Sequence, residues 1–243
     1  MRPLERLRRD AVVLGRMLRG MPHRAAHAER LQSFYAPQAA HYDEFRDRLL
    51  PGRAELVERL PLPEAARVVE LGGGTARNAE FFGPRLARIA ELTVVDLCPA
   101  LLDVARARAG RLANLRVVEA DATTYRPDAP VDCVYFSYAL TMIPDWRGAL
   151  ANAWSMLKPG GAIGAVDFYV PEAAGTRRVG RLQRAFWRSW FAHDGVRLDP
   201  AHLANLCGTF PQHTLDERRA RVPYLPGLRV PYYLFVGRKP EAS

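Results

Sequence analysis

V-V-E-L-G-G-G-T-A, at residues 68–76, is a short β-branched run that ends in three consecutive glycines. A buried strand that ends in glycine can turn sharply, and a ligand can then approach the bare backbone. The stretch departs from the dinucleotide-binding fingerprint, because Arg77 stands where that pattern needs a small residue and Glu70 lies inside the strand. It predicts the first strand and turn of an α/β ligand-binding domain. Helix–strand packing is the alternative reason for the glycines.

Strand-like and helix-like segments alternate along the chain from this turn onward. Strands are expected at residues 66–71, 91–97, 115–119, 131–137 and 162–168, and helices at 75–88, 98–110 and 144–157. The sequence K-P-G-G at 158–161 predicts the end of the last helix and a turn. Such alternation predicts a parallel sheet covered on both faces. Two further runs, at 213–224 and 230–238, are joined by a short Pro-Gly turn and predict an antiparallel hairpin.

The first sixty residues have helical periodicity. Residues 3–30 predict one helix with an apolar stripe among arginines, and residues 31–60 predict further helices that break near Pro51 and Gly52. The longest apolar run near the start covers only residues 11–14, so we expect neither a signal peptide nor a membrane-spanning helix. The three scattered cysteines suggest no disulfide framework and no metal site, which fits a reducing cytoplasm.

Two short segments carry the whole net charge of +9. Residues 1–30 hold eight arginines and three acids, a net charge of +5, and residues 173–193 hold five arginines and no acid. Local basic patches of this kind usually contact phosphate or anionic lipid. The alternative is a pair of solvated helix faces in an arginine-rich chain, since lysine occurs only twice.

Three acidic residues fall near the ends of three successive predicted strands. Asp96 follows Glu70 by 26 residues, and Asp121 follows Asp96 by another 25. Because the carboxyl ends of parallel strands share one edge of the sheet, we expect the three acids at a common ligand site. Asp96 is placed to accept two ribose hydroxyls, and Asp121 is placed to accept an adenine amino group. Each acid alone could instead be a helix N-cap.

Over residues 60–170 the order of the glycine turn, the two acids and K-P-G-G resembles the class I S-adenosylmethionine-dependent methyltransferases. The resemblance implies a Rossmann-like, seven-stranded, mostly parallel sheet with an antiparallel final hairpin. It implies S-adenosyl-L-methionine as cofactor and S-adenosyl-L-homocysteine as product. It also implies cofactor contacts at these residues: Tyr35, Tyr42, Arg53, Glu70, Gly72, Gly74, Thr75, Asp96, Leu97, Asp121, Ala122, Ser137 and Met142.

The segments outside this core suggest the acceptor. The loop at 136–146 lacks the Asn/Asp-Pro-Pro-aromatic pattern of enzymes that methylate base amines. Residues 34–53, 186–199 and 222–237 resemble the betaine-lipid N-methyltransferases, which trimethylate the amine of diacylglyceryl homoserine. This resemblance implies N-methyl transfer to a lipid amine. A phosphatidylethanolamine N-methyltransferase and a soluble small-molecule methyltransferase remain as alternatives.

Substrate contacts are expected from aromatic and basic side chains. Tyr138, Tyr169, Trp187 and Tyr232 are candidates to hold a trimethylated cation by cation–π contact, with core packing as the alternative. Arg178 and Arg181 are candidates for the homoserine carboxylate. No general base stands out, although His193 and Asp167 lie within sequence reach.

Residues 177–191 interleave these arginines with aromatic residues, and predict a lid in contact with a membrane surface. The alternatives are an amphipathic helix packed on the sheet, or an RNA-binding segment.

These observations define an expected organisation. Residues 1–60 would form a helical cap that closes over the cofactor, and residues 61–243 the methyltransferase domain, with a substrate insertion at about 170–212. We expect a cytoplasmic protein that associates peripherally with an anionic membrane surface. The expected partners are the lipid substrate and the enzyme that makes diacylglyceryl homoserine, and no nucleic acid is expected.

Overall fold

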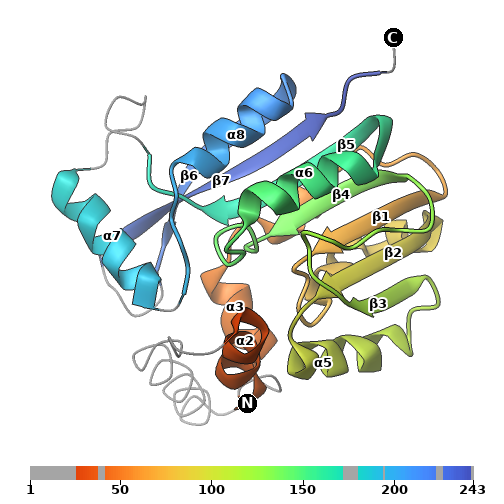
Figure 1. The fold of residues 1–243 in the computed structure, drawn as a ribbon, viewed down its shortest axis with the longest axis horizontal. Helices are drawn as coiled ribbons and strands as arrows, with labels where there is room; N and C mark the ends of the chain where they lie inside the picture. Colours follow the sequence, from red (N-terminus) through yellow and green to blue (C-terminus); the bar gives the residue numbers. More distant parts are fainter. Residues whose placement is uncertain (1–25, 38–41, 172–179, 194, 223–226, 242–243) are drawn as a thin grey trace.

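The computed structural model describes residues 26–37, 42–171, 180–193, 195–222 and 227–241. Their centre is a seven-stranded sheet with the order β3-β2-β1-β4-β5-β7-β6 (Figure 1). The strands are β1 (Ala66–Leu71), β2 (Ile89–Asp96), β3 (Leu115–Glu119), β4 (Val131–Ser137), β5 (Leu157–Phe168), β6 (Gln212–Arg221) and β7 (Arg229–Arg238). Strands β1 to β5 are parallel, and β7 runs antiparallel to both β5 and β6. The fold class expected from the sequence is confirmed.

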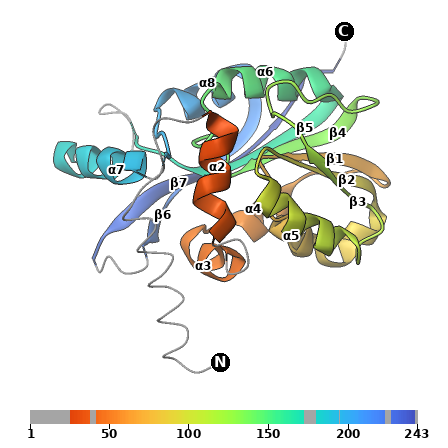
Figure 2. The same cartoon turned by 60° about the horizontal axis from the view of Figure 1, so that its bottom comes forward.

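Helices cover both faces of this sheet (Figure 2). They are α2 (His27–Tyr35), α3 (Tyr42–Leu49), α4 (Arg53–Arg59), the 3-10 helix η2 (Arg77–Arg88), α5 (Pro99–Ala109), α6 (Trp146–Met156), α7 (Arg181–His193) and α8 (Ala201–Thr209). Buried side chains of α4, η2, α5 and α7 form one core cluster with the sheet, and those of α6 and α8 form another. The two clusters account for the near-continuous apolar character of the central strands, which are buried on both sides.

Strand β4 illustrates this two-sided burial. Cys133 and Tyr135 belong to the α4, η2 and α5 side, whereas Val134 and Phe136 belong to the α6 and α8 side. All four side chains are fully buried, as the alternation of side chains along a strand requires. The rigid centre of the sheet therefore fixes where the loops after β1, β2 and β4 begin.

The N-terminal helices pack on the carboxyl end of the sheet. Leu31, Phe34 and Tyr35 of α2 form a third core cluster with Cys98 and Leu101 at the start of α5. Helices α3 and α4 are separated by a break at residues 51–52, as the sequence predicts, and Gly52 adopts a left-handed φ of 82°. The helix predicted over residues 3–30 lies largely outside the described residues.

Two local predictions were wrong. The K-P-G-G sequence follows the end of α6, as predicted, but it lies inside β5, which begins at Leu157, and not in a turn before that strand. Its four residues stand opposite Asp132 alone, where the register between β4 and β5 shifts. The helix expected at 75–88 is a 3-10 helix broken at Gly83, whose ψ of −133° is not helical. Pro84 explains this break, since a proline disfavours the helical conformation in the residue before it.

In the part of the chain that the structure describes, no helix is both long and apolar enough to cross a membrane.

Candidate functional site

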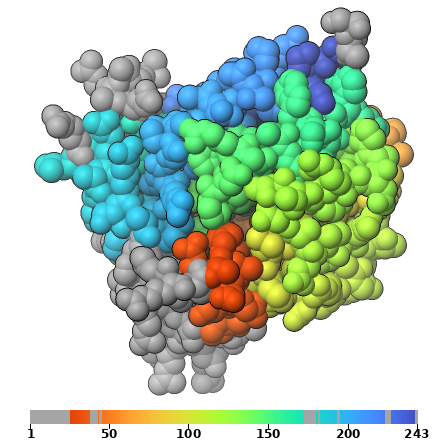
Figure 3. Space-filling model, viewed as in Figure 1, coloured from red at the N-terminus to blue at the C-terminus, as the bar shows by residue number. Residues whose placement is uncertain are grey.

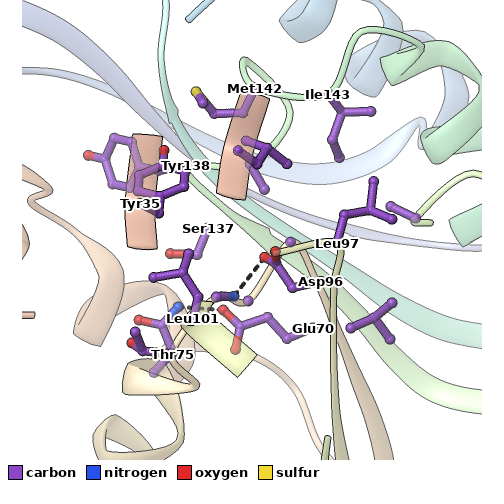
Figure 4. Close-up of a pocket in the computed structure, with 18 of the residues that line it drawn as sticks. Tyr35, Glu70, Thr75, Asp96, Leu97, Leu101, Ser137, Tyr138, Met142 and Ile143 are labelled. Carbon is purple, nitrogen blue, oxygen red and sulfur yellow. Dashed lines mark hydrogen bonds between the residues drawn. The ribbon is translucent and has the colours of Figure 1, made fainter. Parts of the chain in front are cut away.

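The loops after β1 to β4 meet α2 and α3 around a cavity of about 250 Å³ (Figure 4). None of the described residues that line this cavity comes later in the chain than Asp145. Twelve of the predicted cofactor contacts line it: Tyr35, Arg53, Glu70, Gly72, Gly74, Thr75, Asp96, Leu97, Asp121, Ala122, Ser137 and Met142. Tyr42 begins α3, and its side chain lies outside the described residues. The structure thus brings these residues together, while their contacts to a cofactor remain predictions.

The glycine turn leaves its backbone bare on the cavity wall. Gly72 has a φ of 73°, and a Cβ atom there would lie 2.6 Å from the Cβ of Ala139. The amides of Gly72 and Gly73 donate to the carbonyl of Val95, at 2.8 and 3.2 Å. A side chain at position 72 would therefore both strain the backbone and collide with the loop after β4.

Asp96 ties the glycine turn to the end of β2. Its Oδ2 accepts from the amide of Gly74 at 2.9 Å, a bond drawn in Figure 4, and its Oδ1 accepts from the amide of Cys98 at 2.9 Å. Burial raises the pKa of this carboxyl, and the backbone hydrogen bonds oppose that rise. Each carboxylate oxygen can accept more than one hydrogen bond, so Asp96 can still accept hydroxyls of a ligand in the cavity.

Glu70 lies deeper in the wall and is fully buried. Its Oε1 accepts from Asn78 Nδ2 at 2.6 Å, and its Oε2 accepts from the hydroxyl of Tyr135 at 2.8 Å. Burial nevertheless raises its pKa to about 7. Arg53 and Asp96 also act on this carboxyl, the first lowering its pKa and the second raising it.

We expect the Glu70 carboxyl to make stability depend on pH. Between pH 4.5 and about 7 the folded protein keeps a proton that the unfolded chain loses. The free energy of unfolding should therefore fall as pH rises through this window, by up to about 3 kcal/mol at about 1.4 kcal/mol per pKa unit. Glu70→Gln cannot ionise and should lack this contribution.

Urea unfolding of the wild type and of Glu70→Gln at pH 4.5 and 7.5 measures this contribution. Subtracting the unfolding free energy of one protein from that of the other cancels the effect of the other titrating groups. An unchanged difference at the two pH values would show that folding does not raise the pKa of Glu70.

Arg53 makes its described contacts within the protein. Its Nε donates to the carbonyl of Leu50 at 3.3 Å, its Nη1 lies 3.5 Å from Asn78 Oδ1, and its Nη2 pairs with Asp47. The predicted contact of Arg53 with a cofactor carboxylate would have to compete with Asp47.

Asp121 is not a helix N-cap, because no described helix lies between β3 and β4. Its Oδ1 accepts from the amide and the hydroxyl of Thr123, each at 2.7 Å, and so shapes the turn after β3. The residue also lines the cavity together with Ala122. Asn152 of α6 holds this turn from outside by donating to the carbonyls of Ala122 and Tyr125.

Sequence reasoning missed the acids of α3. Asp43 accepts from Thr75 Oγ1 at 2.6 Å and from Arg108 Nη2 at 2.9 Å. Asp47 accepts from Arg77 Nη2 at 2.9 Å. These bonds hold α3 against the glycine turn. The two acids are one helical turn apart in Y-D-E-F-R-D-R, and this spacing could have indicated that they share a face of the helix. Other polar lining residues that were missed are His27, Arg46, Asn78, Thr123 and Asp145.

The cavity suits an adenosyl group with an attached amino acid. It combines bare glycine backbone, the half-buried carboxylate of Asp96 and apolar side chains such as Leu97 and Leu101. The hydroxyl of Ser137 is buried in its wall and has no hydrogen-bond partner within the described ranges. Buried polar groups normally find partners, so this hydroxyl is suited to bind a ligand.

Of the aromatic substrate candidates, only Tyr138 lines the cavity. Its hydroxyl donates to the carbonyl of Pro51 at 2.7 Å, and its backbone adopts a left-handed φ of 54°. Tyr169, Trp187 and Tyr232 are buried away from the cavity wall, so the core-packing alternative describes them better. The apolar surroundings of the sheet explain this, because large rings stabilise a core most when buried.

The remaining substrate candidates lie outside the site as described. Arg178 is outside the described residues, and Arg181 begins α7 with its side chain outside them. The side chain of His193 is likewise not described. Asp167 is fully buried and accepts from the amide and hydroxyl of Thr141, at 3.1 and 2.8 Å, so it anchors the loop after β4. Among the described residues, no three His, Cys, Asp or Glu side chains gather as a metal site requires.

Comparison with known families matches residues 68–161 to a model described as a methyltransferase domain. The matched segment runs from within β1 to the first residues of β5, and therefore contains the glycine turn, Asp96 and Asp121.

Comparison with individual curated proteins also finds methyltransferases. A trans-aconitate 2-methyltransferase of Methylobacterium radiotolerans is 34% identical over 165 residues, which are 68% of this chain and 60% of the relative. The chain spans between 46% and 61% of the length of the first curated relatives that it matches.

Two solved structures share the fold. The N-methyltransferase NodS of Bradyrhizobium japonicum, in complex with S-adenosyl-L-homocysteine, is 18% identical and has a TM-score of 0.65, covering 89% of this chain and all of that one. Phosphoethanolamine N-methyltransferase 2 of Haemonchus contortus, with phosphomonomethylethanolamine and S-adenosylhomocysteine, is 14% identical and has a TM-score of 0.69, covering 89% and 61%. The described part of the chain therefore has the same fold as these two structures.

Proposed function

We propose that this protein is an S-adenosylmethionine-dependent methyltransferase. The observation that carries the proposal is the bond between Asp96 and the amide of Gly74, which sets a half-buried carboxylate beside bare glycine backbone on the cavity wall. When bound, the cofactor supplies a methyl group on a positively charged sulfur. The protein's part is to align the acceptor with that methyl and to exclude water, which contributes several kcal/mol.

The described residues divide this work between two sides of the cavity. Asp96, Leu97, Asp121 and Ala122 would hold the nucleoside. Glu70, Gly72 and Gly74 lie on the neighbouring side, toward Ser137, and would hold the amino-acid part. Tyr35, Tyr138 and Met142 gather on the side away from Glu70 (Figure 4), where an acceptor would enter.

We propose further that the acceptor is the amine of diacylglyceryl homoserine, which would gain up to three methyl groups. Support comes from the flanking segments that resemble betaine-lipid N-methyltransferases, and from the basic, aromatic character of α7. The attacking nitrogen must be neutral, so an amine proton is lost before each of the three transfers, and bulk water can accept it. Tyr138, which lines the cavity, would contact the resulting trimethylated cation.

Measuring the mass of the reaction products tests this proposal. Incubation with S-adenosylmethionine and diacylglyceryl homoserine in detergent micelles should add one, two and three methyl groups to that lipid. Parallel reactions contain phosphatidylethanolamine or trans-aconitate, the second chosen because the relative named above is a trans-aconitate 2-methyltransferase. Methylation of phosphatidylethanolamine alone would assign the sister lipid activity. Methylation of trans-aconitate alone would assign a soluble carboxylate acceptor and contradict the lipid proposal.

A further inference from the structure

Helix α7 exposes apolar side chains to solvent. Among the side chains that the structure describes, the two exposed large hydrophobic ones are Leu182, with 89% of its surface accessible, and Phe186, with 39%. They stand four residues apart in α7 and therefore share one face of the helix. Figures 1 and 3 place α7 at an edge of the molecule. Two large apolar side chains gathered on one edge indicate a contact surface.

The opposite face of α7 explains how the helix is held. Trp187 is fully buried and Phe191 nearly so, and both belong to the core cluster of the sheet. Phe191 lies 5.0 Å from Phe168 at the end of β5, and Phe168 lies 4.7 Å from Tyr138, measured between ring centroids. Because Tyr138 lines the cavity, an unbroken run of rings joins the inner face of α7 to the cavity wall.

The charge of α7 selects the kind of partner. Residues 181–193 contain three arginines and no aspartate or glutamate. Arg188 is exposed, whereas Arg184 is half-buried and lies seven residues before Phe191, on the inner face of the helix. An arginine on the same solvent-exposed side as leucine and phenylalanine suits a bilayer, where the apolar side chains enter the headgroup layer and the guanidinium group binds phosphate. A purely apolar protein partner would not need this uniform positive charge.

We propose that the outer face of α7, where Leu182, Phe186 and Arg188 are exposed, is the surface by which this protein docks on an anionic lipid bilayer. The inference rests on the proposed lipid acceptor and names the partner of the same site. The run of packed rings would connect this membrane-facing surface to Tyr138, on the side of the cavity where the acceptor would enter.

Sedimentation of the full chain with vesicles tests the proposal. We expect binding to vesicles of phosphatidylglycerol and phosphatidylcholine, and much weaker binding to phosphatidylcholine alone. The double variant Leu182→Ser, Phe186→Ser should lower the partition coefficient by about 10- to 100-fold, from the loss of two apolar insertions. Arg188→Gln should lower it by about fivefold, whereas the matched control Arg111→Gln, in an exposed turn after α5, should not.

Retained binding of S-adenosylhomocysteine would show that the variants are folded. If the double variant still binds vesicles as the wild type does, the proposal that α7 is the docking surface is wrong, and the basic residues 1–30 become the candidate. Absence of vesicle binding by the wild type would also overturn the proposal. Neither result bears on methyl transfer, which is measured in detergent micelles, so failure of the docking surface and failure of the proposed reaction are distinguishable.

Discussion

Gly72→Ala is expected to destabilise the protein and abolish cofactor binding. The left-handed φ of 73° costs an L-residue about 1–2 kcal/mol, and a Cβ atom 2.6 Å from the Cβ of Ala139 adds an overpacking cost of about 1–3 kcal/mol. For a chain of this size, each kcal/mol lowers Tm by about 2–4 °C, so the midpoint should fall by about 4–20 °C. Relief of the clash would move the glycine turn or the loop after β4, and both line the cavity. Calorimetric titration with S-adenosylhomocysteine should then detect no binding.

Gly208→Ala is the matched control for this substitution. Gly208 lies in α8, where an added Cβ atom meets no atom within 4 Å. The same chemical change should there raise stability by about 0.5–1 kcal/mol and leave binding intact. If Gly72→Ala binds S-adenosylhomocysteine with wild-type affinity, the ligand does not occupy this cavity.

Asp96→Ala should weaken binding of S-adenosylhomocysteine by about 100-fold or more. A hydroxyl bound to a charged acceptor contributes about 1.5–3 kcal/mol, and two ribose hydroxyls would bind this carboxylate. The variant also leaves the amides of Gly74 and Cys98 without their acceptor, which loosens the turn itself. Asp96→Asn retains one acceptor oxygen and should show an intermediate loss. Isothermal titration with S-adenosylhomocysteine measures all three proteins.

Asp103→Ala is the control for the loss of an acid in the same region. Asp103 lies on α5, 73% of its side chain is exposed, and it pairs with Arg106 on the surface. Surface pairs of this kind contribute little, so binding should be unchanged. Equal affinities of Asp96→Ala and the wild type would exclude the ribose role and require another basis for the nucleoside site.

The sequence alone predicts the centre of the sheet well, because strands such as β1 and β4 are buried on both faces. The bounds of β1, β3 and β4 agree residue by residue with the predicted ranges. The cavity follows from the same signal, since parallel strands deliver Gly72, Asp96 and Asp121 to one edge. These residues depend on local position in a regular element, which periodicity reveals.

Contacts between distant segments escaped the sequence for an equally physical reason. Asp43 and Asp47 act on Thr75, Arg77 and Arg108, and no local pattern in residues 42–49 reports which arginines will face them. Likewise, an aromatic residue near the end of a strand packs in the core as readily as it faces a ligand. Tyr138 and Tyr169 have similar sequence surroundings, yet only Tyr138 reaches the cavity.

The described cavity residues all lie at or before Asp145, in the first part of the chain. Helices α7 and α8 and the final hairpin come later, and the two strands of that hairpin stand at one end of the sheet order. Substitutions at exposed positions of this later part, such as Leu182, can therefore accumulate without touching the cavity wall. The buried positions lack this freedom, because Phe191 packs through Phe168 on Tyr138 of the cavity wall.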